Sequence, residues 1–148
     1  MLPAFFVRYR GIVKLYNSLF EGVLEKYGLT QLEIDILLFL ANHPTCDTAR
    51  DIVEKRHLAK SHVSAGVESL AGRGLLERSR LGGNRKTIHL KLTERAAPIV
   101  EEGRAVQLRY GTLLLDGFSE QERELLCSFL ERVGANVDAA LRPASGQN

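Results

Sequence analysis

Residues 60–70 combine an apolar stripe with small, hydrogen-bonding and basic side chains. Val63, Val67 and Leu70 recur every three or four positions, which predicts a helix with one buried face. The residues off this stripe are short or cationic: Lys60, Ser61, His62, Ser64, Ala65 and Ser69. A helix with such a face can enter the DNA major groove, which is about 12 Å wide, and donate hydrogen bonds to base edges. We therefore expect this helix to read double-stranded DNA.

The next segment has the composition of a slender, basic hairpin. Leu75–Arg80 and Thr87–Leu92 are compatible with β-strands, and Gly82-Gly83-Asn84 between them tolerates the positive φ of a tight turn. Arg85 and Lys86 follow the turn, so the tip should touch phosphates or the minor groove. Surface serines and glycine turns are also common in proteins that bind no DNA. Their adjacency within one basic segment is what favours DNA.

The positive charge of the chain is concentrated in its centre. Residues 45–95 hold eleven Lys or Arg against six Asp or Glu, a net charge of +5, whereas the flanks hold nine against twelve, a net charge of −3. All four histidines lie between His43 and His89, so their protonation would make the centre more positive. A basic centre between acidic ends indicates that the middle of the chain meets a polyanion.

Three helices are expected before the DNA-reading helix. Apolar residues recur every three or four positions over residues 5–27, and Gly28 ends that helix. Each of the next two helices starts at a threonine with an acid three residues later, the pattern of a capping box. These pairs are Thr30 with Glu33, ahead of an apolar helix at 31–42, and, in weaker form, Thr48 with Asp51, ahead of a short helix to about residue 56.

Two long helices are expected after the hairpin. Thr93 should cap a helix that runs from Glu94 to about residue 115, where Gly117 breaks it. Ser119 and Glu122 form a third capping box, ahead of a last helix with apolar periodicity. The predicted elements follow the order of a winged helix-turn-helix, namely helix, helix, short helix, turn, helix and hairpin. Long helices flank this arrangement.

This order of elements and two local motifs resemble the MarR family of transcriptional regulators. The family's wing has the pattern Asp-x-Arg, followed by five residues and then Leu-Thr. This sequence has Asn84-Arg85-Lys86, followed by five residues and then Leu92-Thr93. Residues 70–78 match the end of its recognition helix and its first wing strand. The resemblance implies a mainly α fold, a winged helix-turn-helix with a two-stranded β wing and long N- and C-terminal dimerisation helices. It implies one MarR-type domain over residues 1–141, with the winged lobe at 30–93, the dimerisation region at 3–28 and 94–141, and a disordered tail at 142–148.

The resemblance also implies a function. The chain is expected to act as a homodimer on a pseudo-palindromic operator, because two-fold symmetry places two recognition helices one DNA turn apart, about 34 to 36 Å. Many members of the family bind a small aromatic or phenolic effector between the dimer helices and the winged lobe. Residues that could line such a pocket, or simply form core, are Tyr9, Tyr16, Phe20 and Arg109. Repression is expected rather than activation, because blocking a polymerase requires only occupancy of the DNA.

Three positions depart from the family pattern. Asn84 stands where the family usually has Asp and Lys86 where it has Arg, so the sequence lacks a carboxylate-guanidinium pair that would fix the wing. Ala65 occupies a position that is often basic, and it can meet a thymine methyl group but cannot read guanine. These departures keep a second function open, that of a winged-helix protein-interaction module without specific DNA binding.

The expected DNA contacts divide by type. Base contacts are expected from Lys60, Ser61, His62 and Ser64. Phosphate contacts are expected from Arg73, Arg78 or Arg80, and Arg85 is the expected minor-groove probe.

The flanking helices carry more apolar side chains than one small winged lobe can cover. They include Tyr9, Ile12, Tyr16, Leu113, Leu114, Phe118, Leu126 and Phe129. An apolar surface of this extent calls for a partner, which agrees with the homodimer that the resemblance implies. The alternative is that these residues form a core within one chain.

Catalytic and metal chemistry is not indicated. The sequence contains no nucleophile elbow, phosphate-binding glycine loop or His-Glu metal motif, so no enzyme activity, cofactor or metal is expected. Asp47 beside Cys46 opposes formation of a reactive thiolate. Cys127 lies in an apolar stretch and is expected to be inert packing.

A membrane location is not indicated either. The longest apolar run, Ile36–Ala41, has six residues, whereas a span needs about 20. The first ten residues lack the features of a signal peptide. A cytoplasmic protein is therefore expected.

Overall fold

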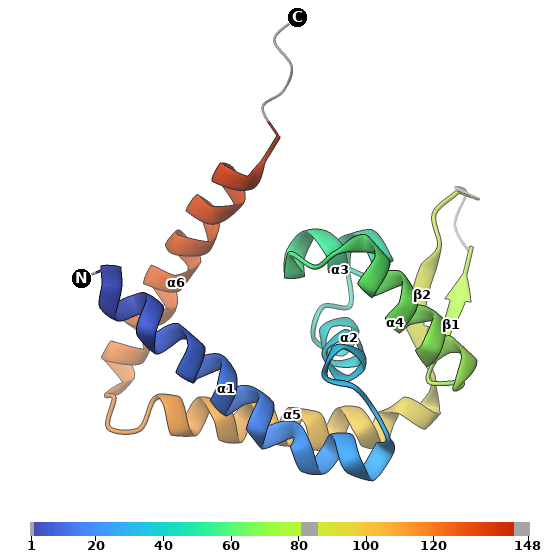
Figure 1. Ribbon diagram of the computed structural model, residues 1–148, viewed down its shortest axis with the longest axis horizontal. Helices are drawn as coiled ribbons and strands as arrows, with labels where there is room; N and C mark the ends of the chain where they lie inside the picture. The colour runs from blue at the N-terminus through green and yellow to red at the C-terminus, as the bar shows by residue number, and fades with distance from the viewer. Residues whose placement is uncertain (1, 81–85, 144–148) are drawn as a thin grey trace, which may run out of the picture. The chain divides into compact units, whose positions relative to one another are not determined.

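The computed structural model describes residues 2–80 and 86–143. Over these residues the chain forms six α-helices and a two-stranded antiparallel sheet (Figure 1). The elements are α1 (Leu2–Tyr27), α2 (Gln31–Asn42), α3 (Ala49–Arg56), α4 (Lys60–Gly72), β1 (Leu76–Ser79), β2 (His89–Leu92), the 3-10 helix η1 (Glu94–Ala96), α5 (Ala97–Leu114) and α6 (Glu120–Leu141). The chain divides into two compact units, one up to Tyr110 and one from Gly111 onward. No described helix is long and apolar enough to cross a membrane.

The core of the first unit is built around α2. Ile34, Ile36, Leu37 and Leu38 are each at most 1% exposed, because α2 is apolar on nearly all sides and is covered by the rest of the lobe. α4 and β2 pack against it, as does α1, and α3 packs on α4. Figure 1 shows α2, α3, α4 and the two strands gathered together. The uninterrupted apolar run in the sequence therefore marks the central helix of the lobe.

The starts of α2, α3 and α6 follow the predicted capping boxes. The Thr30 and Thr48 side chains accept the backbone N–H three residues later, and the acid at that position accepts in return. The box at Thr48 is complete rather than weak, because the shorter Asp51 side chain still reaches the Thr48 backbone N–H at 3.1 Å. Ser119 and Glu122 form the third box.

The start of α5 differs from the prediction. The Thr93 hydroxyl donates to the Gly74 carbonyl at 2.7 Å and forms no capping bond. The chain first makes the 3-10 turn η1, and the regular helix begins only at Ala97. Thr93 instead joins the turn after α4 to the start of the α5 segment, with its backbone N–H donating to Leu75 as well.

The two strands are paired antiparallel, with Leu76 opposite Leu92 and Ser79 opposite His89. Each strand is shorter than the predicted run. Leu76 and Leu90 are buried against the lobe. The predicted turn at Gly82-Gly83-Asn84 lies outside the described residues, as do Arg85 and the tail residues 144–148.

α1 and α5 lie antiparallel, side by side. Near the end of α1, Lys26 and Tyr27 both bond to Glu102, and farther toward its start the Ile12 carbonyl accepts from the Tyr110 hydroxyl at 3.2 Å. The rings of Tyr16 and Tyr110 meet edge to face, with centroids 5.0 Å apart. The first unit therefore includes α1 and most of α5 together with the winged lobe.

The second unit comprises the end of α5, a turn and α6. Gly117 takes a φ of +80°, and the Arg123 guanidinium donates to the Leu115 and Phe118 carbonyls. No residue of α6 is buried within the single chain. Cys127 is exposed, so the expectation that it packs in the interior does not hold for the single chain.

Candidate nucleic-acid interface

α4 presents its apolar stripe to the lobe and its polar residues to solvent. Val63 and Leu70 are fully buried and Val67 is 4% exposed, which confirms the predicted stripe. The first turn and a half of the opposite face carries Lys60, Ser61, His62, Ser64 and Ala65, all of them exposed. Among the described residues, none of these five side chains has a hydrogen bond or an ion pair. The structure thus brings five of the predicted contact residues together on one accessible surface.

Gly66 sets how closely α4 approaches the core. A Cβ at this position would lie 2.6 Å from Cδ1 of the fully buried Ile36 and 3.5 Å from Leu32. A side chain at this position would therefore force the buried Ile36 side chain, or α2 with it, to shift. The role of Gly66 could not be predicted from the sequence, because a glycine within a helical pattern signals only a lower helix propensity.

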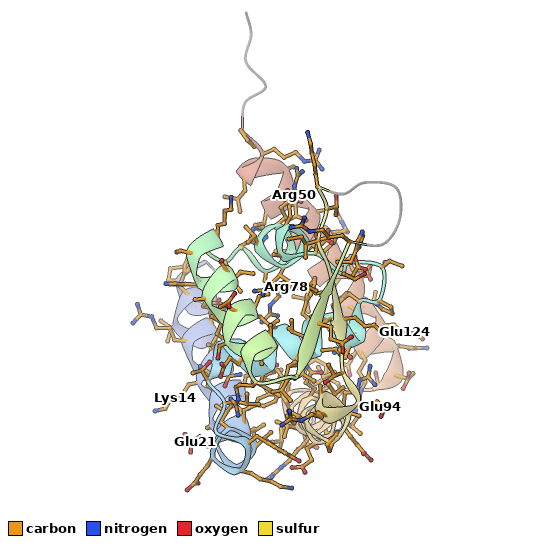
Figure 2. The ribbon with its side chains drawn as sticks, turned by 90° about the vertical axis from the view of Figure 1, so that its right-hand side faces the viewer. Lys14, Glu21, Arg50, Arg78, Glu94 and Glu124 are labelled. Carbon is orange, nitrogen blue, oxygen red and sulfur yellow. The ribbon has the colours of Figure 1, made fainter. Side chains whose placement is uncertain are left out.

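Basic side chains flank α4 on both sides. Arg50 on α3 pairs with Glu54 at 2.7 Å, and Arg78 on β1 pairs with Glu68 on α4 at 2.6 Å. Figure 2 shows Arg50 and Arg78 on the side of the lobe where α3, α4 and the strands meet. Arg80 and Lys86 are exposed near the ends of the two wing segments. Arg50 was not among the predicted contact residues, although it belongs to the basic centre of the sequence.

Ser69 and Arg73 lie elsewhere. The Ser69 hydroxyl donates to Oε1 of Glu33, which is only 6% exposed. Arg73 follows α4 and donates to the carbonyls of Tyr27 at 2.6 Å and Gly28 at 2.9 Å. Both side chains therefore have polar partners within the lobe, which Lys60, Ser61, His62, Ser64 and Ala65 lack among the described residues, although Ser69 itself is exposed.

Glu33 collects these bonds at the start of α2. Burial alone would raise the pKa of its carboxyl group. The hydrogen bonds from Ser69 and from the Thr30 backbone and side chain, together with the charge of Arg73, hold the pKa below its ordinary value. Glu33 therefore stays ionised while it holds the end of α4 to the start of α2.

The wing is tied to the lobe through Asp47. Its side chain meets Nδ1 of His89 at 2.8 Å, and its backbone carbonyl accepts from the Leu90 N–H at 2.7 Å. These contacts join the segment before α3 to β2. Asn84 and Arg85, the predicted tip contacts, lie outside the described residues.

A cleft of about 710 Å³ lies between α3, α4 and β2. Its walls are mainly apolar, with Val53, Val67 and Ile88 among them, and it is also lined by Arg50, Lys60, Ser64 and Arg78. This volume falls within the range of about 300 to 1,000 Å³ that is typical of small-molecule sites.

The polar cluster around Tyr16 is much smaller. The Tyr16 hydroxyl lies 3.5 Å from Asp35 and accepts from Gln107 at 3.3 Å, and Arg56 lies 3.6 Å from the same Asp35 carboxylate. Burial raises the pKa values of both Tyr16 and Asp35. The cavity here holds about 50 Å³, too little for an aromatic effector. Phe20, another of the predicted pocket residues, is fully buried core.

Most of the predicted dimerisation residues are exposed within the single chain. The exposed ones are Tyr9, Ile12, Leu113, Leu114, Phe118 and Phe129. Leu126 is half-buried. Tyr16 differs, because its ring packs on Phe20 and its hydroxyl faces Asp35 inside the first unit.

A known protein family matches most of the winged lobe. The model of the MarR family matches residues 27–86, which span the end of α1 through the start of the second wing segment.

Solved MarR-type structures share the fold of nearly the whole chain. A MarR-family regulator from Listeria monocytogenes, solved with a 26mer DNA, is 19% identical with a TM-score of 0.79, over 95% of this chain and 90% of that one. S. aureus MepR, solved as a DNA complex, is 19% identical with a TM-score of 0.68, and the match covers 89% of this chain and 91% of that one. Another solved transcriptional regulator is 23% identical with a TM-score of 0.79, and the match covers 91% of this chain and 98% of that one. These similarities confirm the predicted winged helix-turn-helix with long flanking helices.

Proposed function

We propose that the chain is a homodimeric, sequence-specific transcriptional regulator that inserts α4 into the major groove of a pseudo-palindromic operator and acts as a repressor. The observation that carries this proposal is the exposed face of α4. Lys60, Ser61, His62, Ser64 and Ala65 are accessible and have no internal polar contacts among the described residues, whereas Ser69 and Arg73 do. Side chains left unengaged in this way are available to an external partner.

The chemistry of the five side chains suits base edges. Lys60 can donate to the O6 and N7 acceptors of guanine, and the hydroxyls of Ser61 and Ser64 can donate or accept. Ala65 can pack on a thymine methyl group. Arg50, Arg78 and Arg80 around this face supply positive charge for phosphates, in addition to Lys86 in the wing. Two of the similar solved structures contain DNA, which supports the same use of the fold here.

Dimerisation is supported by the exposed apolar side chains of the long helices. Phe6, Tyr9, Leu125, Phe129, Leu130 and Val133 are all more than half exposed in the single chain. The charges are also complementary: residues 2–20 of α1 hold three basic and no acidic residues, whereas α6 holds five acidic against two basic. We propose that α1 and α6 of two copies meet and bury these faces, because an exposed apolar surface of this size is unfavourable in water.

We further propose that a small aromatic or phenolic acid regulates DNA binding from the cleft beside α4. Its apolar walls suit a ring, and Arg50, Lys60 and Arg78 suit a carboxylate. Lys60 and Ser64 line the cleft and also belong to the proposed DNA face, so ligand and DNA would compete for them. Benzoate, titrated into the protein-DNA complex, tests this proposal: release of the DNA supports it, and unchanged binding up to tens of millimolar contradicts it.

The central test is a DNA selection followed by fluorescence anisotropy across salt concentrations. We expect selected DNA to be pseudo-palindromic and to bind at least about 1,000-fold more tightly than scrambled DNA. We also expect log K to fall by about 0.9 per neutralised phosphate as log salt rises. Lys60→Ala should weaken binding to the selected DNA. Arg142→Ala, which removes an exposed arginine that follows α6, should not weaken it.

The same experiment separates the second function. Equally weak binding to every DNA would indicate a winged-helix protein-interaction module. The pairing of Arg78 with Glu68 is the observation in its favour, because it neutralises one of the predicted phosphate contacts.

A further inference from the structure

Arg73 lies directly after the recognition helix, but its side chain turns away from the DNA face. The residue ends α4, and its guanidinium points back to the end of α1. There it donates to the carbonyls of Tyr27 and Gly28, at 2.6 and 2.9 Å. The last carbonyls of a helix lack partners within the helix and carry its negative dipole end. Arg73 therefore caps α1 from another helix.

A contact with Glu33 reinforces the bonds that Arg73 makes to the end of α1. Oε2 of Glu33 lies 3.8 Å from the Arg73 guanidinium and accepts from the Thr30 N–H at 2.8 Å, while Oε1 accepts from Ser69. Two side chains from the last turn of α4 thus meet the junction between α1 and α2. A planar guanidinium that donates to two carbonyls fixes orientation as well as distance.

The contact continues from α1 to α5. Tyr27 accepts from Arg73 through its carbonyl and donates through its hydroxyl to Glu102 on α5, at 2.7 Å. Lys26 bonds to the same carboxylate. An uninterrupted series of direct hydrogen bonds therefore joins the end of the recognition helix to two of the long helices.

The N-terminal end of α4 is held by fewer polar contacts than its C-terminal end. Ala59 is the residue before the helix, and it supplies no side-chain capping bond. Packing holds the middle of the helix through Val63 and Val67, but polar contacts that define its direction are concentrated at its C-terminal end. The direction in which Lys60 and Ser64 point then depends on how the other end is held.

We propose that Arg73 is a positioning residue that fixes the recognition helix against α1 and α5, and thereby sets the half-site spacing that the dimer accepts. This inference rests on the proposed function. It replaces the predicted phosphate contact of Arg73 with a role inside the protein. Spacing is the property affected, because the long helices relate the two recognition helices of a dimer, and one base pair changes the half-site position by about 3.4 Å and about 36°.

The test compares Arg73→Gln, Arg73→Lys and wild type on operators whose half-sites are moved by one base pair in either direction. Wild type should prefer the selected spacing at least about tenfold, since each poorly met base pair costs about 1 to 3 kcal/mol. Arg73→Gln should reduce that preference to about threefold or less while keeping base preference within each half-site and the salt dependence. Arg73→Lys, which keeps the charge but can reach the carbonyls only as a point donor, should fall between the two.

Arg123→Gln is the matched control. Arg123 also donates to two carbonyls at a helix end, but these are the carbonyls of Leu115 and Phe118, at the turn between α5 and α6. This variant should keep the spacing preference of wild type. Amide hydrogen exchange without DNA supplies a second measurement: Arg73→Gln should speed exchange in α4 and in the last turn of α1, and Arg123→Gln should not.

Two results would overturn the inference. If Arg73→Gln weakened all spacings equally and lowered the salt slope by about one, Arg73 would be a phosphate contact. If spacing preference and hydrogen exchange both stayed at their wild-type values, Arg73 would position nothing. Wild-type protein that bound every spacing alike would instead contradict the proposed function, and hydrogen exchange would then decide separately whether Arg73 couples the helices.

Discussion

Glu33 and Asp35 lie two residues apart on α2, yet their surroundings move their pKa values in opposite directions. Burial opposes ionisation of Glu33, but the bonds from Ser69 and Thr30 and the nearby Arg73 outweigh it and lower the pKa. Burial also opposes ionisation of Asp35, and there Gln31, Arg56 and Tyr16 offset it only in part, so the pKa is raised. Ionised Glu33 therefore stabilises the fold, and ionised Asp35 destabilises it.

Stability should consequently depend on pH with opposite signs at the two positions. A lowered pKa gives stability that is present above the ordinary pKa and is lost as pH falls through the folded value. Glu33→Gln should therefore cost about 1.5 to 3 kcal/mol at pH 7, the worth of a charge-assisted hydrogen bond, and less as the solution becomes acidic. A raised pKa gives a cost that grows as pH rises, so Asp35→Asn should gain stability relative to wild type with rising pH.

Urea unfolding of wild type and both variants between pH 3.5 and 7 measures these differences. Each variant serves as the control for the other, because both remove one carboxylate from the same helix. If the free energy of unfolding of both variants, relative to wild type, changed with pH in the same direction, the environments assigned to Glu33 and Asp35 would be wrong.

Ser64 belongs to the exposed face of α4 and has no internal partner among the described residues. If it reads one base, Ser64→Ala should reduce discrimination at one operator position by about 1 to 3 kcal/mol and leave the other positions unchanged. Competition binding with single-base operator variants measures this change. Ser18→Ala is the control, because its hydroxyl bonds to the Leu15 carbonyl within α1. A uniform loss at all positions would show that Ser64 does not read a base.

At the scale of the elements, the seating of α4 on α2 depends on Gly66. A Cβ there would meet the buried Ile36 side chain at 2.6 Å, so Gly66→Ala should destabilise the lobe by about 1 to 3 kcal/mol despite the better helix propensity of alanine. Gly72→Ala is the control in the same helix, because its Cβ would meet nothing within 4 Å. That variant should be neutral or more stable by up to about 1 kcal/mol. Equal effects of the two substitutions on urea unfolding would show that close packing at Gly66 is not limiting.

Local signals in the sequence were sufficient to predict these elements. The three capping boxes, the glycine stop at Gly28 and the stripe on α4 each depend on residues within one or two helical turns, and each is present in the structure. The failures involve distant partners. Thr93 bonds to Gly74 instead of capping its own helix, and the contact of Arg73 with Tyr27 of α1, 46 residues away, was not anticipated. Periodicity carries no information on such contacts.

At the scale of the whole molecule, the two sets of predicted site residues differ in what the single chain reveals. The exposed face of α4 that we propose for DNA contact is held by α2 and α3 of the same chain. The apolar residues of α6 are not buried in one chain, which favours the proposal that a second copy covers them. The alternative that these residues form an intramolecular core is not supported for α6, since none of its residues is buried.

Dimerisation and DNA binding should therefore fail together when the face of α6 is made polar. Phe129 is 52% exposed, and Phe129→Glu would place a charge in the proposed interface, where an unpaired charge is costly. We expect sedimentation to show a monomer, and DNA affinity to fall with a salt slope about half that of wild type, because one recognition helix contacts about half of the phosphates. Ser128→Glu adds the same charge at the neighbouring exposed position and should leave both the dimer and the slope unchanged. If Phe129→Glu stayed dimeric with an unchanged slope, α6 would not form the interface, and the copies would have to meet through α1 and α5 alone.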